Sequence, residues 1–183
     1  VLEGVLTGPV NGVRASLSSS GTLLYVRGSR DRELVEVGIG GEITPLRLRP
    51  GAYSHPRLSP DGKHLAVVVT SAASTGAAPV EELRVYDLST GSATILANGQ
   101  RITSPSWGGG GRLLVYGTGG RDSVVIWERS ADASAPATVL TTRRGMFMNS
   151  VVSPDGQWIV FGRPPRGSEE GGLFYAATRG DTV

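Results

Sequence analysis

Short runs of apolar residues, separated by turns that contain glycine, recur along the whole chain. In one type of run the apolar residues are consecutive, as in Leu65–Val69 and Trp158–Phe161, whereas other runs alternate, as in Leu83–Asp87. Alternation is typical of a strand with one face toward water, and a short continuous apolar run indicates a strand buried on both faces. No segment keeps a helical period over helical length. The pattern therefore predicts an all-β protein.

The turn that precedes each continuous apolar run repeats along the chain. Its closing glycines are Gly21, Gly62, Gly111 and Gly156, so successive turns are 41, 49 and 45 residues apart. A period of this size, with four short strands in each repeat, predicts a β-propeller built of four-stranded antiparallel blades. About four blades fit into the chain. We expect them to form an arc of a larger ring.

Two of these turns share one sequence, Ser59-Pro60-Asp61-Gly62 and Ser153-Pro154-Asp155-Gly156. Proline presets φ at the second position, aspartate tolerates the bridge-region backbone conformation of the third, and glycine supplies the positive φ of the fourth. The serine hydroxyl can bond to a backbone amide within the turn. These preferences predict a hairpin closed by a type I turn and a left-handed glycine. We therefore interpret both aspartates as structural turn residues and not as catalytic ones.

The repeat divides the chain into successive blades. Residues 1–12 give an outer strand of a preceding or closing blade, followed by blade 1 (13–50), blade 2 (51–99), blade 3 (100–144) and an incomplete blade 4 (145–183). The segment Val1–Val5 either pairs beside Gly172–Ala176, which would close a ring of four blades, or belongs to a preceding blade. We favour the second arrangement. It would expose apolar residues such as Val160 and Phe161, to be covered by the remaining blades of a parent protein or by self-association.

Composition excludes several classes of function. Among the 183 residues, 18 basic and 16 acidic side chains leave a net charge of +2, and the basic residues are scattered, so we expect no nucleic-acid partner. Cysteine is absent, which excludes disulfides and thiol catalysis. No apolar run approaches the roughly 18 residues that span a bilayer. We expect no membrane insertion by this chain, and any export signal would lie outside it.

The residues that could carry chemistry do not form a catalytic set. No Gly-x-Ser-x-Gly sequence is present, and the sole lysine, Lys63, follows no phosphate-binding loop. The only histidines, His55 and His64, lie several residue pairs apart on one predicted hairpin, which suits a joint metal site poorly. We therefore predict that this chain is not an enzyme and holds no cofactor or metal.

A binding surface is the remaining hypothesis. In a propeller, the loops that lead into the first strand of each blade lie beside the central channel. Here these loops bring together aromatic and polar groups, the mixture found at recognition sites. The candidate channel-mouth residues are Tyr53, His55, Arg101, Phe147, Met148 and Asn149. We expect a protein or a small ligand there, with the alternative that Phe147 and Met148 only fill space between blades.

Two long stretches resemble a known family. Pro56–Val67, followed by Leu83–Gly91, resembles the TolB-like (WD-like) propeller repeat of bacteria. Gly21–Val26 and Asp155–Val160 are similar to the propellers attached to many bacterial serine/threonine protein kinases. The resemblance covers nearly the whole chain and is closest in blades 2 and 4.

The resemblance implies a non-catalytic module that binds a protein or ligand as a sensor or scaffold. The likeness to kinase-associated propellers implies the C-terminal sensory part of a bacterial signalling protein, on the extracytoplasmic side. The alternative is an accessory, gating propeller of a serine peptidase whose catalytic domain lies outside this chain. Because the repeat residues shape turns, no catalytic residue is implied.

Overall fold

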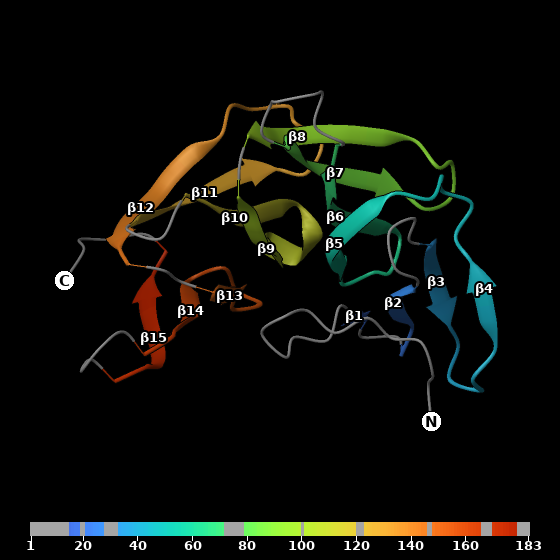
Figure 1. Cartoon of the computed structure of the whole chain (residues 1–183), viewed down its shortest axis with the longest axis horizontal. Coiled ribbons are helices and arrows are strands. Elements are labelled where there is room, and N and C mark those ends of the chain that lie inside the picture. The colour runs from blue at the N-terminus through green and yellow to red at the C-terminus, as the bar shows by residue number, and fades with distance from the viewer. Residues whose placement is uncertain are drawn as a thin grey trace. The chain divides into compact units, whose positions relative to one another are not determined.

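The computed structural model describes residues 15–18, 21–27, 33–71, 79–99, 101–119, 123–145, 148–165 and 170–178. Over these ranges the chain forms fifteen strands and one short 3-10 segment, η1 (Gly109–Gly111). The chain divides into two compact units, Val1–Asn98 and Gly99–Val183, called unit 1 and unit 2 (Figure 1). Within the described ranges, no helix is long and apolar enough to cross a membrane.

Unit 1 contains two antiparallel sheets of four strands in sequential order. The first is β1 (Ala15–Leu17), β2 (Leu23–Arg27), β3 (Glu33–Val37) and β4 (Ile43–Pro45); the second is β5 (Ala52–Leu58), β6 (His64–Thr70), β7 (Glu81–Asp87) and β8 (Ala93–Gly99). The sheets share an apolar core in which Leu24 and Leu34 meet Leu65. A hydrogen bond also joins them, because the amide of Leu58 donates to Ser16 Oγ at 2.9 Å.

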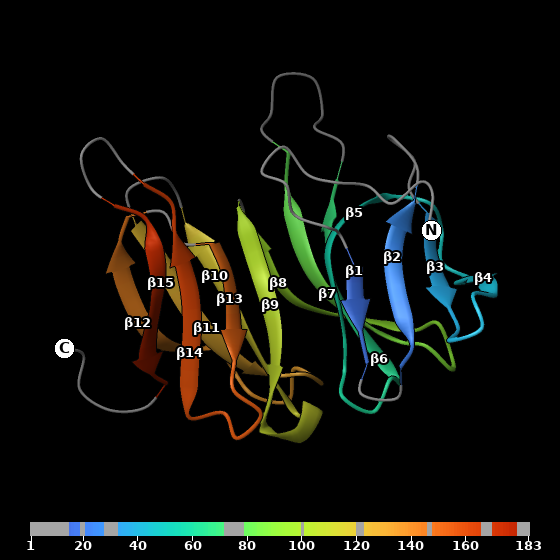
Figure 2. The same cartoon turned by 90° about the horizontal axis from the view of Figure 1, so that it is seen from below.

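Unit 2 contains a four-stranded and a three-stranded antiparallel sheet, again in sequential order. The strands are β9 (Ile102–Gly108), β10 (Leu113–Gly119), β11 (Ser123–Ser130) and β12 (Thr138–Arg144), then β13 (Met148–Val152), β14 (Trp158–Arg163) and β15 (Gly172–Ala177). The two sheets pack face to face (Figure 2), with Val115 and Ile126 of one against Ile159 and Phe161 of the other. The amide of Val152 donates to Ser106 Oγ at 2.9 Å, the counterpart of the bond in unit 1.

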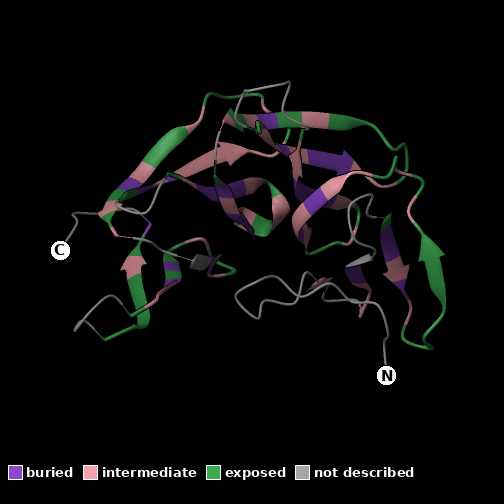
Figure 3. Cartoon of the chain, in the orientation of Figure 1, coloured by how far each residue is buried: buried purple, intermediate pink, exposed green. Residues whose placement is uncertain are grey.

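Strand β6 is buried on both faces, which explains its run of consecutive apolar residues. In β6, the side chains from Leu65 to Val68 have no measurable exposure. The prediction of an all-β chain made of antiparallel sheets is confirmed. In unit 2 the first strand, β9, is almost entirely buried, whereas the second strand of the last sheet, β14, alternates between buried and exposed residues (Figure 3). The last sheet has three strands in the described residues, which agrees with the incomplete blade predicted over residues 145–183.

The sequence predicts strands over His55–Leu58, Ser104–Trp107 and Ile43–Leu48, and the structure differs at one end of each. β5 begins at Ala52 and not at His55, and β9 begins at Ile102 and not at Ser104. In both strands the extra residues lie before a bulge, and a bulge interrupts the alternation by which a strand is recognised. β4 ends at Pro45 and not at Leu48, although the amide of Leu46 still donates to the carbonyl of Leu34 at 2.8 Å.

The sequence predicts that Val160 and Phe161 are both exposed, and the prediction is right for Val160 alone. Val160 is 42% exposed, but Phe161 is only 7% exposed. Successive side chains of a strand point to opposite faces, so Phe161 packs on the sheet β9–β12 while Val160 points away from it. The pairing proposed for Val1–Val5 lies outside the described residues, so the arc remains a prediction.

Candidate functional site

The two Ser-Pro-Asp-Gly turns have the same geometry. In the first, Ser59 Oγ donates to Asp61 Oδ1 at 2.6 Å and accepts the amide of His64 at 2.9 Å. In the second, Ser153 Oγ donates to Asp155 Oδ1 at 2.5 Å, and the amide of Trp158 donates to Ser153 Oγ at 3.0 Å. Each carboxylate is therefore held by the backbone and side chain of its own turn.

The closing glycines of these turns have positive φ, 71° at Gly62 and 74° at Gly156. In each turn the glycine amide donates to the serine carbonyl, at 2.9 Å in the first and 2.8 Å in the second. Pro60 and Pro154 occupy the second positions, where no N–H is needed. This is the hairpin connection that the sequence indicates.

The candidate channel-mouth residues lie in different environments. Tyr53 is buried in the core of unit 1, where its hydroxyl donates to the carbonyl of Arg49. Burial first, and then the neighbouring Tyr86, raises the pKa of Tyr53 to about 12. Tyr53 is thus a core residue and offers no ring to a ligand. His55 is half-buried in β5.

The remaining channel-mouth candidates belong to unit 2. Arg101 is exposed, with a positive φ of 56°, directly before β9. Phe147 lies outside the described residues. Met148 and Asn149 belong to the backbone of β13, and their side chains lie outside the described set. Arg101 thus directly precedes β9, and Met148 and Asn149 lie within β13.

The first strands carry a repeated irregularity that the sequence does not reveal. The register of β5, β9 and β13 shifts at the same place, and His55 and Ser104 there have positive φ of 51° and 52°. Such a conformation costs a non-glycine residue roughly 1–3 kcal/mol and is often found next to functional sites. In unit 2 this bulge also joins two sheets, because Ser150 Oγ donates to the carbonyl of Ser104 at 3.3 Å.

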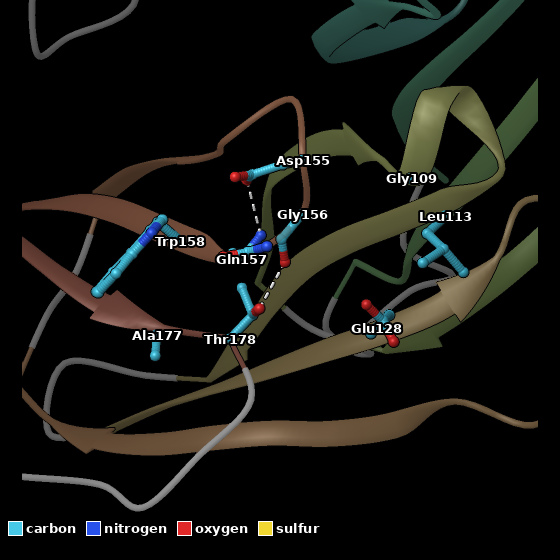
Figure 4. Close-up of a pocket in the computed structure, with 9 residues that line it drawn as sticks. All are labelled: Gly109, Leu113, Glu128, Asp155, Gly156, Gln157, Trp158, Ala177 and Thr178. Carbon is cyan, nitrogen blue, oxygen red and sulfur yellow. Dashed lines mark hydrogen bonds between the residues drawn. The ribbon is translucent and has the colours of Figure 1, made fainter.

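A pocket of about 620 Å³ lies in unit 2 where the second Ser-Pro-Asp-Gly turn meets the preceding sheet (Figure 4). Its volume falls in the range of small-ligand sites, roughly 300–1,000 Å³. The residues that line it come from η1, β10, β11, β14, β15 and the turn: Gly109, Leu113, Glu128, Asp155, Gly156, Gln157, Trp158, Ala177 and Thr178. We call this the β11–turn pocket.

Hydrogen bonds fix one wall of the β11–turn pocket. Thr178 Oγ1 donates to the carbonyl of Gly156 at 2.5 Å, and the amide of Thr178 donates to the carbonyl of Gln157 at 2.8 Å. The amide of Gln157 in turn donates to Asp155 Oδ1 at 3.0 Å. Figure 4 shows this ladder opposite Glu128 and Leu113. The pocket wall is thus held by the end of β15 and by the turn together.

The charge of the β11–turn pocket is negative. Glu128 and Asp155 line it, and none of its lining residues is basic. The hydroxyl of Ser153, followed by the amide of Gln157, lowers the pKa of Asp155, so this carboxylate is ionised at neutral pH. Two carboxylates in one lining favour a positively charged group.

Reasoning from sequence missed most of this pocket. It singled out Asp155 and Gly156 as turn residues but gave no role to Glu128, Gln157 or Thr178. Glu128 and Asp155 belong to different repeats and line one pocket because the two sheets of unit 2 pack together. An alignment of the repeats, combined with the packing of one blade on the next, would have been needed to place them in the same pocket.

The chain has the fold of several solved structures. TolB from Acinetobacter baumannii superposes with a TM-score of 0.69 over 97% of this chain and 42% of its own, at 19% identity. A protein of Agrobacterium tumefaciens assigned as TolB matches 89% of this chain and 57% of its own, with a TM-score of 0.65 and 19% identity. The tricorn protease matches 92% of this chain and 21% of its own, with a TM-score of 0.69 and 12% identity.

The fold is a β-propeller. Each sheet is one blade, numbered 1 to 4 along the chain, and TolB-like propellers are among its structural neighbours. No family model matches the sequence, and no curated protein matches it. The chain spans about half the length of the TolB structures. In the described part of the propeller, no three His, Cys, Asp or Glu side chains are grouped as a metal site would require.

Proposed function

We propose that this propeller is a non-catalytic binding module and that its ligand presents a positively charged group to the β11–turn pocket. The observation that carries the proposal is a cavity of about 620 Å³ with carboxylates from Glu128 and Asp155 and no basic residue in its lining. An arginine or lysine side chain of a protein partner has the matching charge and a reach suited to such a cavity.

The lining residues support binding better than catalysis. The hydroxyl of Thr178 donates its proton to the carbonyl of Gly156 and not to either carboxylate of the lining, so no general base activates it. Asp155 is held within its turn by Ser153 and the backbone. These groups can recognise a cation, but they do not assemble a nucleophile with a general base.

Binding is tested with an acetylated, amidated hexapeptide that has one central arginine, titrated calorimetrically into the 183-residue chain. We expect saturable binding that weakens with added salt and is lost when citrulline replaces the arginine. Glu128→Gln should weaken binding about two- to fivefold, the usual effect of one exposed ion pair. The matched control is Glu36→Gln, which removes the same charge from β3 of unit 1.

Equal binding of the arginine and citrulline peptides, or no effect of Glu128→Gln, would show that the pocket does not select a cation. The non-catalytic part of the proposal is tested separately with an activated ester, a peptide and a nucleoside triphosphate. We expect no turnover by the repurified chain. Turnover that survives a second purification would overturn this part.

We further infer that the propeller is the sensory part of a longer bacterial signalling protein, such as a serine/threonine kinase. The support is the likeness of Gly21–Val26 and Asp155–Val160 to kinase-associated propellers. A second candidate, favoured by the structural likeness to the tricorn protease, is a gating propeller of a peptidase. The neighbouring coding sequence distinguishes them: an upstream kinase domain supports the first, and a downstream Gly-x-Ser-x-Gly domain supports the second.

A further inference from the structure

The residue that follows the closing glycine differs between the two Ser-Pro-Asp-Gly turns. It is Lys63 in the first turn and Gln157 in the second. The backbone role of this residue is the same in both. The amide of Lys63 donates to Asp61 Oδ1 at 3.1 Å, and the amide of Gln157 donates to Asp155 Oδ1 at 3.0 Å. The turns therefore differ at this position in side-chain charge and not in their hydrogen bonds.

Lys63 places a positive charge beside the carboxylate of its own turn. The hydroxyl of Ser59, followed by the amide of Lys63, lowers the pKa of Asp61, and nearby positive charges, that of Lys63 among them, lower it further by a smaller amount. For Asp155, the groups that lower the pKa are hydrogen bonds of its own turn, first that of the Ser153 hydroxyl. The first turn thus supplies a cation to its carboxylate, and the second turn has a neutral residue in that place.

Gln157 belongs to the lining of the β11–turn pocket, together with Glu128 and Asp155. Figure 4 shows its position between Asp155 and Thr178. The residue is exposed, so no packing in the core fixes its side chain. A charge on this side chain would share the cavity with both carboxylates, and the low-dielectric walls of a cavity strengthen such an effect. A substitution at position 157 therefore changes the charge of the pocket directly.

A lysine at this position would act against a cationic ligand in two ways. Its ammonium would pair with the carboxylates of the pocket in the place of the ligand, and it would repel the positive group that the ligand presents. Such repulsion is one of the means by which a protein rejects a partner. Glutamine does neither, and its amide oxygen is a further hydrogen-bond acceptor for a guanidinium.

We propose that residue 157 determines the charge specificity of the β11–turn pocket. With Gln157, the pocket carries two carboxylates and accepts the guanidinium or ammonium of a partner. With lysine there, a side chain of the protein itself would compete for these carboxylates. This inference rests on the proposed function, because it concerns the ligand of the same pocket, and it adds the residue that decides whether a cation can bind.

The probe is the acetylated, amidated hexapeptide with one central arginine, titrated calorimetrically into the 183-residue chain and into variants at position 157. Gln157→Lys should weaken binding about tenfold, because a like charge enters the pocket. Gln157→Glu should strengthen it about two- to fivefold, the effect of one more ion pair. Gln157→Met, which keeps the length and the neutrality but loses the amide, should weaken binding less than Gln157→Lys.

Two controls separate this effect from misfolding and from net charge. Gln157→Lys gives the second turn the sequence Ser-Pro-Asp-Gly-Lys of the first, which forms the same hydrogen bonds, so its urea midpoint should match that of the original chain. The matched charge control is Ser123→Lys, at an exposed residue of β11 five residues before Glu128. This is about 17 Å along an extended strand, beyond the screening length of about 8 Å at physiological salt, so peptide binding should not change.

If the original chain binds the peptide but the Gln157→Lys and Gln157→Glu variants bind it equally, this inference is overturned while the proposed function stands. A weakening by Ser123→Lys or by Gln157→Met as large as that by Gln157→Lys would overturn it too, because net charge or the lost amide would then be the cause. No binding of the peptide by the original chain would overturn both proposals.

Discussion

The turns Ser59–Gly62 and Ser153–Gly156 have the same sequence and the same internal hydrogen bonds, but their surroundings differ. Ser59 is 1% exposed, whereas Ser153 is only partly buried. The second turn lines the β11–turn pocket opposite Glu128, and the first does not belong to it. The four residues therefore determine the shape of the turn, while the neighbouring blade determines what the turn can contact.

This difference limits what a repeated motif says about function. A carboxylate recurs at the third position of both turns because the turn needs an acceptor for backbone and serine donors. In the proposed function, the turn of Asp155 has a second role together with Glu128, which belongs to another repeat. If the proposal holds, function is carried by residues that differ between blades.

The largest expected effect is at the closing glycines. Gly62→Val and Gly156→Val should each lower the free energy of unfolding by about 1–3 kcal/mol, because a β-branched residue is strained at positive φ. At Gly156 a Cβ would meet only the amide nitrogen of Gly109 at 3.7 Å, an ordinary contact, so strain is the cause. The measurement is the urea midpoint of each variant.

The control is Gly172→Ala, at a strand glycine outside the positive-φ region, where a Cβ would meet Phe174 at an ordinary 3.6 Å. Its midpoint should change little. If the valine variants also unfolded at the original midpoint, the positive φ would not contribute to stability. Gly156→Val, unlike Gly62→Val, should also change binding at the β11–turn pocket, because Gly156 lines this pocket.

Most of the fold could be predicted from the sequence, because apolar runs and glycine turns are local signals. The runs Leu65–Val69 and Trp158–Phe161 lie within β6 and β14. The positive φ of His55 and Ser104 was not predicted. Each precedes a proline, and prolines within strands are typical of bulges, so the two prolines were the available signal. The exposure of Phe161 was predicted wrongly, because an apolar run does not tell which face a blade will cover.

The next effect in size separates the two serines. Ser59→Ala should cost about 1–2 kcal/mol, because the amide of His64 loses its acceptor at a serine that is buried. Ser153→Ala should cost less, about 0.5–1 kcal/mol, since water can reach the amide of Trp158. Urea midpoints of the two variants give the difference. Equal losses would mean that burial of the serine does not control the strength of this turn.

The candidate site was less predictable than the fold, for the same physical reason. Tyr53 looked like a recognition residue because loops before first strands face the channel, but it is a core residue. Glu128 looked like an ordinary strand residue. Its place beside the Asp155 turn results from the packing of blade 4 on blade 3, which no local pattern encodes.

The smallest expected effect is on pH dependence. In the folded chain the hydroxyl of Ser59, followed by the amide of Lys63, lowers the pKa of Asp61, and Ser153, followed by Gln157, does the same for Asp155. Each carboxyl thus binds its proton less readily when folded than when unfolded. Its stabilisation is present above the unfolded pKa, about 4, and is lost as pH falls through the lower folded pKa.

Asp61→Asn and Asp155→Asn should therefore each reduce the loss of stability that occurs below pH 4. The two reductions should be similar, because the two turns have equivalent hydrogen bonds. Asp87 gives the reference: its bond from Ser89, followed by the amides of Thr90 and Ser89, lowers its pKa to about 2. Asp87→Asn should flatten the curve most, between pH 4 and 2. The measurement is the urea midpoint from pH 7 to 2. A flattening at Asp155 much larger than at Asp61 would show that Glu128, and not the turn, controls the titration of Asp155.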